Sequence, residues 1–172
     1  LKTTPDALPY LISEKNIKLF TENKIFSETE LRSRYEIMME NYCKVLNIEA
    51  MTMIDMAKRS IIPAAAKYAK QVAETALAEK QLVPALDTSA AEEQTAELSA
   101  TGAQAYGKVK ALADVMLGLR DIKDTTELAF AYRDKVIPAM NELRIACDTL
   151  ETMTAAEDWP YPTYGELLFG VR

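Results

Sequence analysis

Histidine is absent from this sequence of 172 residues. Without an imidazole the chain cannot form a histidine-ligated zinc site, a di-iron site of the Glu-x-x-His type, or a catalytic triad with a histidine base. The sequence also contains neither a glycine-rich phosphate loop nor a Gly-x-Ser-x-Gly elbow. These absences exclude several common kinds of catalytic centre.

Cysteine and basic charge are also scarce. The two cysteines, Cys43 and Cys147, occupy positions whose neighbours indicate a core-facing helix, so we expect buried, unpaired thiols. The net charge is -6, which argues against binding to nucleic acid or to an anionic membrane surface. No apolar run approaches the roughly 20 residues that span a bilayer, and no leader-like segment opens the chain. We therefore expect a cytoplasmic protein.

Glycine is rare, with five residues, whereas the hydrophobic share is 49% and rich in alanine, leucine and methionine. Such a composition favours helices throughout. The length suits one hydrophobic core. We predict an all-α protein with a single helical domain over residues 1–172.

Capping signals and apolar spacing define the expected helices. A short helix is predicted over Ser13–Glu22. Ser27 and Glu30 have the form of a capping box, and apolar residues at steps of three and four continue from there to about Leu82. Pro63 should kink or break this very long helix, since it removes a hydrogen-bond donor.

Two further long helices complete the predicted antiparallel bundle. One opens with the box-like Ser89-x-x-Glu92 and continues to about Leu119. The other begins with Asp124 as its cap and ends near Met153. It has its own interior proline, in DKVIPA, which resembles the RSIIPA segment around Pro63.

The first half of the long helix lacks a partner within the chain beyond the short Ser13–Glu22 helix, because the other long helices are predicted to be much shorter. Either the helix folds back at Pro63, or this half packs on something outside the chain. The candidate packing or interface residues of this half are Tyr35, Met38, Tyr42 and Leu46.

Residues 156–172 form a tail that is rich in aromatic residues. Prolines at 160 and 162 should end the preceding helix and keep the tail extended. The tail then packs either on the bundle or on a missing catalytic body. The candidate packing residues here are Trp159, Tyr161, Tyr164 and Phe169.

Two clusters could carry chemistry but have simpler explanations. Three thioethers, from Met51, Met53 and Met56, could bind Cu(I), although methionine commonly fills gaps in a core. The carboxylates of Glu92, Glu93 and Glu97 could form an acid–base pair, although acidic residues also favour the first turns of a helix. We therefore predict no catalytic, cofactor-binding or metal-binding residue.

Four longer segments resemble a known family. They are FSETELRSRYEI, ENYCKVLNIEAMTMIDMAK, AYRDKVIPAMNELR and WPYPTYGELLF. In this order they resemble the C-terminal region of type III glutamine synthetases, the large bacterial form of that enzyme. The resemblance extends from about Pro9 to Val171 and weakens near residues 85–105. Because the sequence starts at Leu1 and not at Met, we expect a processed chain, an incomplete one or a piece of a larger protein.

The resemblance implies a parent enzyme, a glutamate–ammonia ligase that makes glutamine through a γ-glutamyl phosphate with ATP and magnesium or manganese. The family's catalytic motifs lie earlier in its chains and match no position here. The resemblance thus implies a catalytically inactive region without a cofactor of its own. We expect it to pack on the catalytic domain of the same polypeptide and to organise a homo-oligomer. A stand-alone helical adaptor that binds a partner protein remains the alternative.

Overall fold

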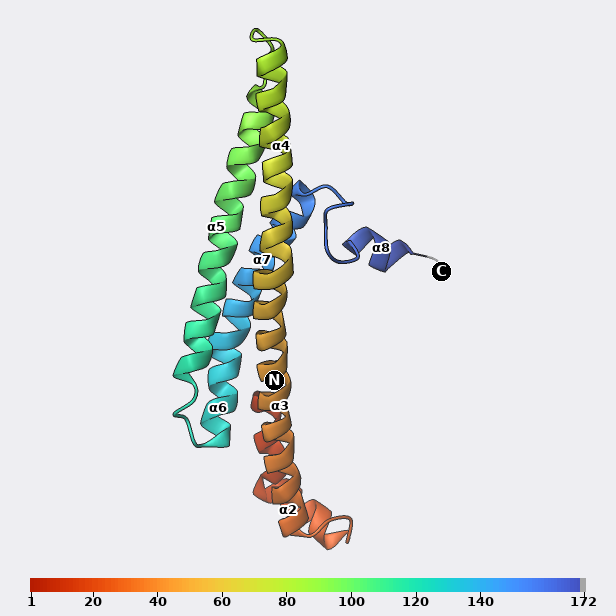
Figure 1. Ribbon diagram of the computed structural model, residues 1–172. Coiled ribbons are helices and arrows are strands. Elements are labelled where there is room, and N and C mark those ends of the chain that lie inside the picture. The colour runs from red at the N-terminus through yellow and green to blue at the C-terminus, as the bar shows by residue number, and fades with distance from the viewer. Residues whose placement is uncertain (171–172) are drawn as a thin grey trace. The chain divides into compact units, whose positions relative to one another are not determined.

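The structure is a computed structural model that describes residues 1–170, apart from the side chain of Tyr164. Every regular element among these residues is helical (Figure 1), which confirms the all-α class. Contacts group the residues into two compact units. Unit 1 comprises Leu1–Met51 and Asp114–Ala139, and unit 2 comprises Thr52–Ala113 and the residues from Met140 onward. The single domain stays a prediction.

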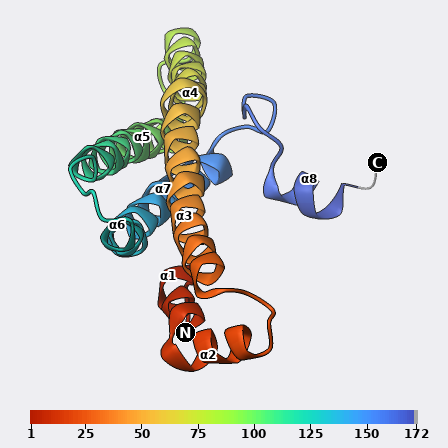
Figure 2. The same cartoon turned by 90° about the horizontal axis from the view of Figure 1, so that it is seen from below.

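Three short helical elements open unit 1: α1 (Thr4–Ala7), the 3₁₀-helix η1 (Leu8–Ile12) and α2 (Glu14–Glu22). They lie beside the start of α3, as Figure 2 shows. The sequence predicted α2 but not α1 and η1, since proline disfavours a helical conformation of the residue before it. Pro5 and Pro9 occupy first turns, where a missing N–H costs no hydrogen bond.

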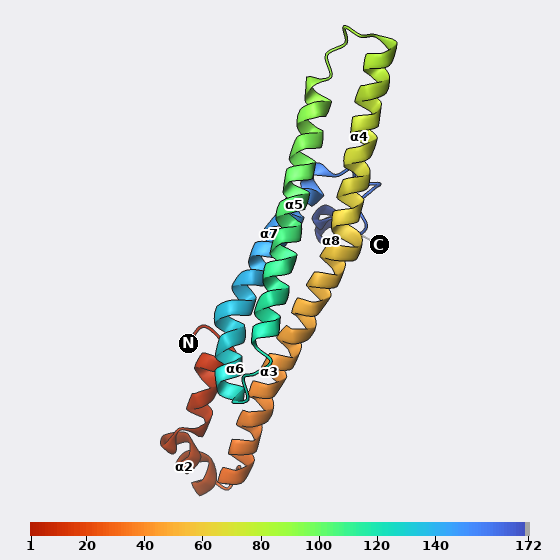
Figure 3. The same cartoon turned by 60° about the vertical axis from the view of Figure 1, so that its left-hand side comes forward.

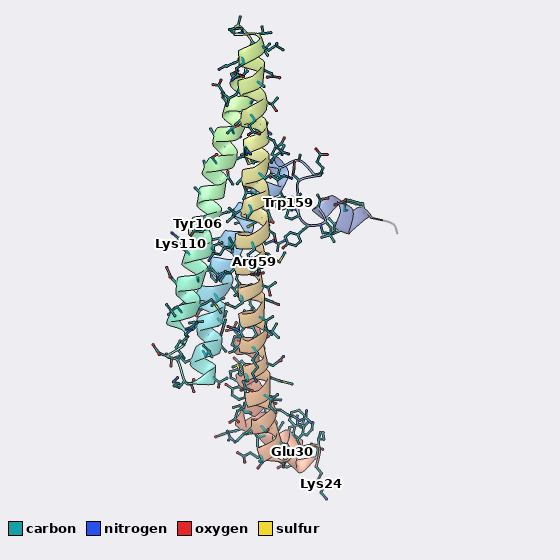
Figure 4. All side chains as sticks on the ribbon, viewed as in Figure 1. Lys24, Glu30, Arg59, Tyr106, Lys110 and Trp159 are labelled. Atoms are coloured by element: carbon teal, nitrogen blue, oxygen red, sulfur yellow. The ribbon has the colours of Figure 1, made fainter. Side chains whose placement is uncertain are left out.

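The turn after α2 is closed by backbone hydrogen bonds. The N–H of Ile25 donates to the carbonyl of Phe20 at 2.9 Å, and the N–H of Lys24 donates to the carbonyl of Thr21 at 3.0 Å. Together these bonds form a Schellman motif. Its left-handed residue is Lys24, with φ of 54°, where glycine is the usual choice (Figure 4).

This conformation predicts that Lys24→Gly stabilises the chain. A side chain in the left-handed region costs roughly 1 kcal/mol, so glycine should raise the free energy of unfolding by up to about that amount. The control is Lys18→Gly inside α2, which should lower it by about 1 kcal/mol. Urea unfolding of both variants provides the measurement. Equal destabilisation by the two glycines would contradict the prediction.

The longest helix comprises α3 (Glu28–Met56), the π-helix η2 (Ala57–Ile61) and α4 (Ile62–Leu82), 55 residues in all. Its predicted capping box is confirmed. The N–H of Glu30 donates to Ser27 Oγ at 3.3 Å, and the N–H of Ser27 donates to Glu30 Oε2 at 2.7 Å. The helix is neither broken nor reversed at Pro63.

A π-helix precedes each interior proline. In η2, the N–H of Ile62 donates to the carbonyl of Ala57, five residues back. The π-helix η3 (Tyr132–Val136) stands in the same register before Pro138, and the N–H of Ile137 donates to the carbonyl of Tyr132. Wider turns compensate for the N–H that proline lacks. This shared device explains why the two proline segments look alike.

The other long helices begin close to their predicted caps. Helix α5 (Ser89–Gly118) is preceded by Thr88, which is buried and donates to Glu92 Oε1 at 2.8 Å, so the contact to Glu92 comes from one residue earlier than predicted. Asp124 caps α6 (Thr125–Ala131) as expected, at 2.7 Å from the N–H of Glu127. Helix α7 (Ile137–Met153) follows η3.

The C-terminal tail contains a helix that the sequence analysis missed. Residues Tyr164–Phe169 form α8, so the extended path predicted for this segment is wrong. Thr163 and Glu166 make a capping box in which the N–H of Thr163 donates to Glu166 Oε2 at 2.8 Å. The prolines at 160 and 162 precede this cap and do not oppose a helix after it.

Each unit has its own core. In unit 1, residues of α3 pack with α6 and η3, and Leu31, Met39, Ala129 and Val136 are fully enclosed. In unit 2, the buried residues include leucines of α5 and α7 and a line of small residues on η2 and α4, namely Ala57, Ala65, Ala69 and Ala76. Alanines allow helices to approach closely. Cys43 and Cys147 are both buried and unpaired, as predicted.

Candidate interaction surfaces

An apolar groove of about 540 Å³ lies in unit 1 between the N-terminal turns and α3. Ile37 and Met38 stand in it exposed, whereas Leu46 is buried. The whole lining consists of Thr4, Leu8, Ile37, Met38, Asn41, Tyr42, Val45, Leu46 and Glu49. An apolar hollow with a few polar groups at its edge is typical of a surface that binds another protein segment.

Tyr42 gives this groove an unusual polar group. Its ring lies in the lining, yet its hydroxyl oxygen is buried and has no hydrogen-bond partner among the described residues. Burial raises the pKa of the Tyr42 hydroxyl, opposed by the nearby positive charge of Arg133. A buried hydroxyl without a partner is costly, so this group favours an added donor or acceptor.

A charged cluster fastens the N-terminal turns of unit 1. Arg133 Nη1 lies 2.5 Å from Asp6 Oδ1, and Arg133 Nε lies 2.6 Å from Asp134 Oδ1. The guanidinium also lies over the ring of Phe130, 4.6 Å from its centroid. The Thr3 hydroxyl donates to Asp6 at 2.6 Å. Through Arg133, η3 therefore holds α1 in place beside the groove.

The cluster predicts an acid-sensitive N-terminus. The Thr3 hydrogen bond, together with Arg133, holds the pKa of the Asp6 carboxyl below its usual value. The ionised Asp6 carboxylate stabilises the folded chain. This stabilisation is complete above the ordinary aspartate pKa and is lost as the pH falls through the lower pKa of the folded chain. Asp6→Asn should speed hydrogen exchange of the η1 amides at neutral pH. In this variant the protection of these amides should no longer fall when the pH is lowered through the Asp6 pKa. Glu36→Gln is the control, and an equal effect there would contradict the prediction.

The structure accounts for the four residues proposed on the first half of the long helix. Tyr35 Oη lies 3.0 Å from the Thr126 hydroxyl of α6, and Leu46 is buried, so one face is covered within the chain. The expectation that this half has no partner in the chain beyond the short Ser13–Glu22 helix is therefore wrong (Figure 3). Helices α3 and α6 run side by side there. Met38 and Tyr42 line the groove instead.

The aromatic residues of the tail lie in different environments. Trp159 and Tyr161 are half-buried in unit 2 and line a hollow of about 330 Å³ together with Cys147. Figure 4 labels Trp159, which lies between α7 and α8. Asp158 Oδ1 fastens this segment to Lys67 Nζ at 2.8 Å. Phe169 is 81% exposed. The Tyr164 side chain lies outside the described part of the structure.

The comparisons with known proteins agree with the resemblance. A family model described as the glutamine synthetase C-terminal domain matches residues 1–80. A glutamine synthetase of Butyrivibrio fibrisolvens is 34% identical over 175 residues, which cover 100% of this chain and 25% of the relative. A type-3 glutamine synthetase of Dictyostelium discoideum is 35% identical, covering 98% of this chain and 24% of the relative. The chain corresponds to the C-terminal domain of type III glutamine synthetases.

This glutamine synthetase C-terminal domain spans about a quarter of the length of the curated relatives it matches. A glutamine synthetase of Bacteroides fragilis aligns in the same way, at 29% identity over 169 residues. In the relatives the matched region is the last quarter of the polypeptide. Most of each relative therefore precedes the segment that corresponds to α1.

Carboxylate oxygens are the protein ligands that magnesium and manganese prefer. Within residues 1–170, no three histidine, cysteine or carboxylate side chains gather as metal ligands would. Glu92 is engaged by Thr88 and Lys80 near the start of α5, and Met51 is exposed while Met53 and Met56 are half-buried. No helix in the same range is long and apolar enough to cross a membrane.

Several groove residues escaped the sequence analysis. Leu8 lies in the N-terminal segment that was not predicted to be helical, and Ile37 lies off the stripe of three- and four-residue steps that marked the core. Arg133 carried no motif. One signal in the sequence was available. An apolar residue outside the apolar stripe of a charged helix indicates an exposed surface that binds something, since the exposed face of a helix is otherwise polar.

Proposed function

We propose that this domain packs on the catalytic part of the same polypeptide through the unit 1 groove, and thereby helps to organise a homo-oligomeric glutamine synthetase. The observation that carries this proposal is an exposed apolar groove lined by α1, η1 and α3. In relatives, the larger part of the polypeptide joins this region from the N-terminal side. A catalytic part joined in the same way would connect to α1, which lines the groove. A short connection raises the local concentration of a docking surface.

The proposal assigns the chemistry to the missing part. Joining ammonia to glutamate with ATP and magnesium or manganese would take place in the catalytic domain, in the cytoplasm. This domain would supply contact area and rigidity. The chain alone, given ATP, glutamate, ammonia and either metal, should form no glutamine, and turnover above that of a buffer blank would contradict this assignment.

A matched pair of substitutions tests the docking. Ile37 and Ile48 both lie on α3 in unit 1 and are 61% and 63% exposed, but only Ile37 lines the groove. In the full-length enzyme, Ile37→Asp would bury a charge at the interface, a cost of several kcal/mol. Ile48→Asp would leave its charge in water.

We expect Ile37→Asp to reduce the oligomer mass in analytical ultracentrifugation and to shorten the half-life of activity on heating. Ile48→Asp should behave as wild type. Both variants need the helical circular dichroism of the parent, which excludes unfolding as the cause. A native oligomer of native heat stability with Ile37→Asp would refute the docking.

A further inference from the structure

The segment that follows α7 forms a strap, which we define as residues 155–170. It shares the hollow of about 330 Å³ with the helices of unit 2. The strap contributes Trp159, Tyr161, Pro162 and Leu167 to the lining, and the helices contribute Met56, Ile61, Cys147, Asp148 and Glu151. The strap is therefore one wall of this hollow, and the helices form the rest.

A pair of opposite charges attaches the strap to α4. Lys67 Nζ donates a hydrogen bond to Asp158 Oδ1 at 2.8 Å, across 91 positions of the chain. The Asp158 side chain is 7% exposed, whereas the Lys67 side chain is 67% exposed. A carboxylate so far out of water depends on its cation, because burying an unpaired charge is costly. The ion pair therefore holds the strap only while both charges are present.

The strap has internal hydrogen bonds that do not involve the helices it lies against. At its start, the N–H groups of Asp158 and Trp159 donate to the carbonyl of Ala155, at 2.9 and 3.1 Å. Near its end, Thr163 and Glu166 form the capping box of α8. These bonds would persist if the strap moved away from the helices. A segment of this kind moves as one piece about its attachment to α7.

The far end of the strap buries little apolar surface. On α8, Leu167, Leu168 and Phe169 are 66%, 72% and 81% exposed. Segments that bury few apolar side chains open at a smaller free-energy cost than global unfolding requires. We therefore expect the strap to open before the helices of unit 2 do.

The strap covers side chains that belong to the interior of unit 2. Cys147 and Ile61 are each 8% exposed, and Met56 is half-buried. Ile61 is the last residue of η2, and Met56 directly precedes that π-helix. Removing the wall that the strap provides would expose these apolar side chains and the Cys147 thiol to water.

We propose that the strap is a hinged cover that opens while the helices of unit 2 stay folded, with the Lys67–Asp158 ion pair as its latch. The closed strap shields the Cys147 thiol and the apolar side chains beside η2, and the open strap exposes both. One ion pair then controls access to them, separately from the stability of the whole chain. This device lies in unit 2 and does not depend on the docking proposed for unit 1.

The first test uses iodoacetamide as a probe of the open strap. The 172-residue chain is labelled with both cysteines present, and peptide mass spectrometry follows each thiol. Lys67→Ala should speed the labelling of Cys147 about tenfold, because the Asp158 carboxylate is then unpaired in the closed strap and hydrated in the open one. Cys43, which lies in unit 1, should keep its wild-type labelling rate.

Lys70→Ala is the matched control. Lys70 lies one turn after Lys67 on α4, with its side chain 72% exposed, and pairs with Glu74 of the same helix at 3.4 Å. It should leave both labelling rates unchanged. The proposal is overturned if Lys67→Ala does not change the Cys147 rate, or if Lys70→Ala raises it equally. An equal rise at Cys43 also overturns it, since the whole chain would then be opening.

The second test asks whether Lys67 acts through Asp158. In an Asp158→Ala background no carboxylate remains at this position, so adding Lys67→Ala should change the Cys147 labelling rate by less than about twofold. A tenfold acceleration in both backgrounds would mean that Lys67 holds the strap by another contact, and would overturn the latch.

Discussion

Iodoacetamide at about pH 8 should leave Cys147 of the folded chain almost unmodified, while the urea-unfolded chain reacts as a free thiol does. Burial raises the pKa of the Cys147 thiol to about 11. Only the thiolate attacks, so the folded chain should react on the order of a hundredfold more slowly. The measurement uses mass spectrometry of a Cys43→Ala variant, in which Cys147 is the single thiol.

The same shift predicts how stability changes in alkali. The pKa of Cys147 in the folded chain lies above the ordinary thiol pKa. The stability gained by keeping this thiol protonated is therefore complete below the ordinary thiol pKa and is lost as the pH rises to about 11. Cys147→Ala should therefore lose less of its free energy of unfolding than wild type over that range. Rapid alkylation of the folded chain, or identical pH profiles, would show that the thiol is not held protonated.

Leu143→Ala should be the most destabilising single substitution of those considered for unit 2. Leu143 is 0% exposed on α7, whereas Ile145, two residues later, is 67% exposed. Truncating an enclosed leucine leaves a cavity and costs roughly 2–5 kcal/mol. Ile145→Ala should change the free energy of unfolding by no more than about 0.5 kcal/mol.

Urea unfolding followed by circular dichroism measures both leucine and isoleucine variants under the same conditions. Hydrogen exchange then shows where the loss occurs, and α5 amides beside α7 should lose protection in Leu143→Ala. If the two substitutions cost the same, the described core of unit 2 would not be the one that stabilises the protein in solution.

Local sequence signals predicted most of the helices. The Ser27 and Glu30 pair and the Asp124 cap each satisfy backbone donors within a few residues, so no knowledge of the remaining fold was required. The same rule would have found α8, whose Thr163 and Glu166 form an equally clear box. The neighbouring Pro160 and Pro162 favour an extended path, and this signal opposes that of the cap.

The packing partners could not be predicted in the same way. The hydrogen bond between Tyr35 and Thr126 joins residues 91 positions apart, and its register depends on the path of the loop before α6. The same holds for Arg133 and Asp6, which are 127 positions apart. A pattern within one helix identifies an apolar face but contains no information about which helix meets it. The proposed interface role of Tyr42 therefore stays a prediction, and the groove that this residue lines was not foreseen.

The π-helices before Pro63 and Pro138 have a consequence for how this domain tolerates changes in length. A π-turn holds one residue more than the α-turn it replaces, so each segment amounts to a single-residue insertion that the helix has absorbed. Elsewhere in these helices, an insertion would rotate every following side chain by about 100° around the axis and expose the core. We expect one-residue deletions between Ala57 and Ile61, combined with replacement of Pro63, to preserve folding that the same deletions within α5 abolish. Circular dichroism of the two sets of deletion variants would reveal the difference.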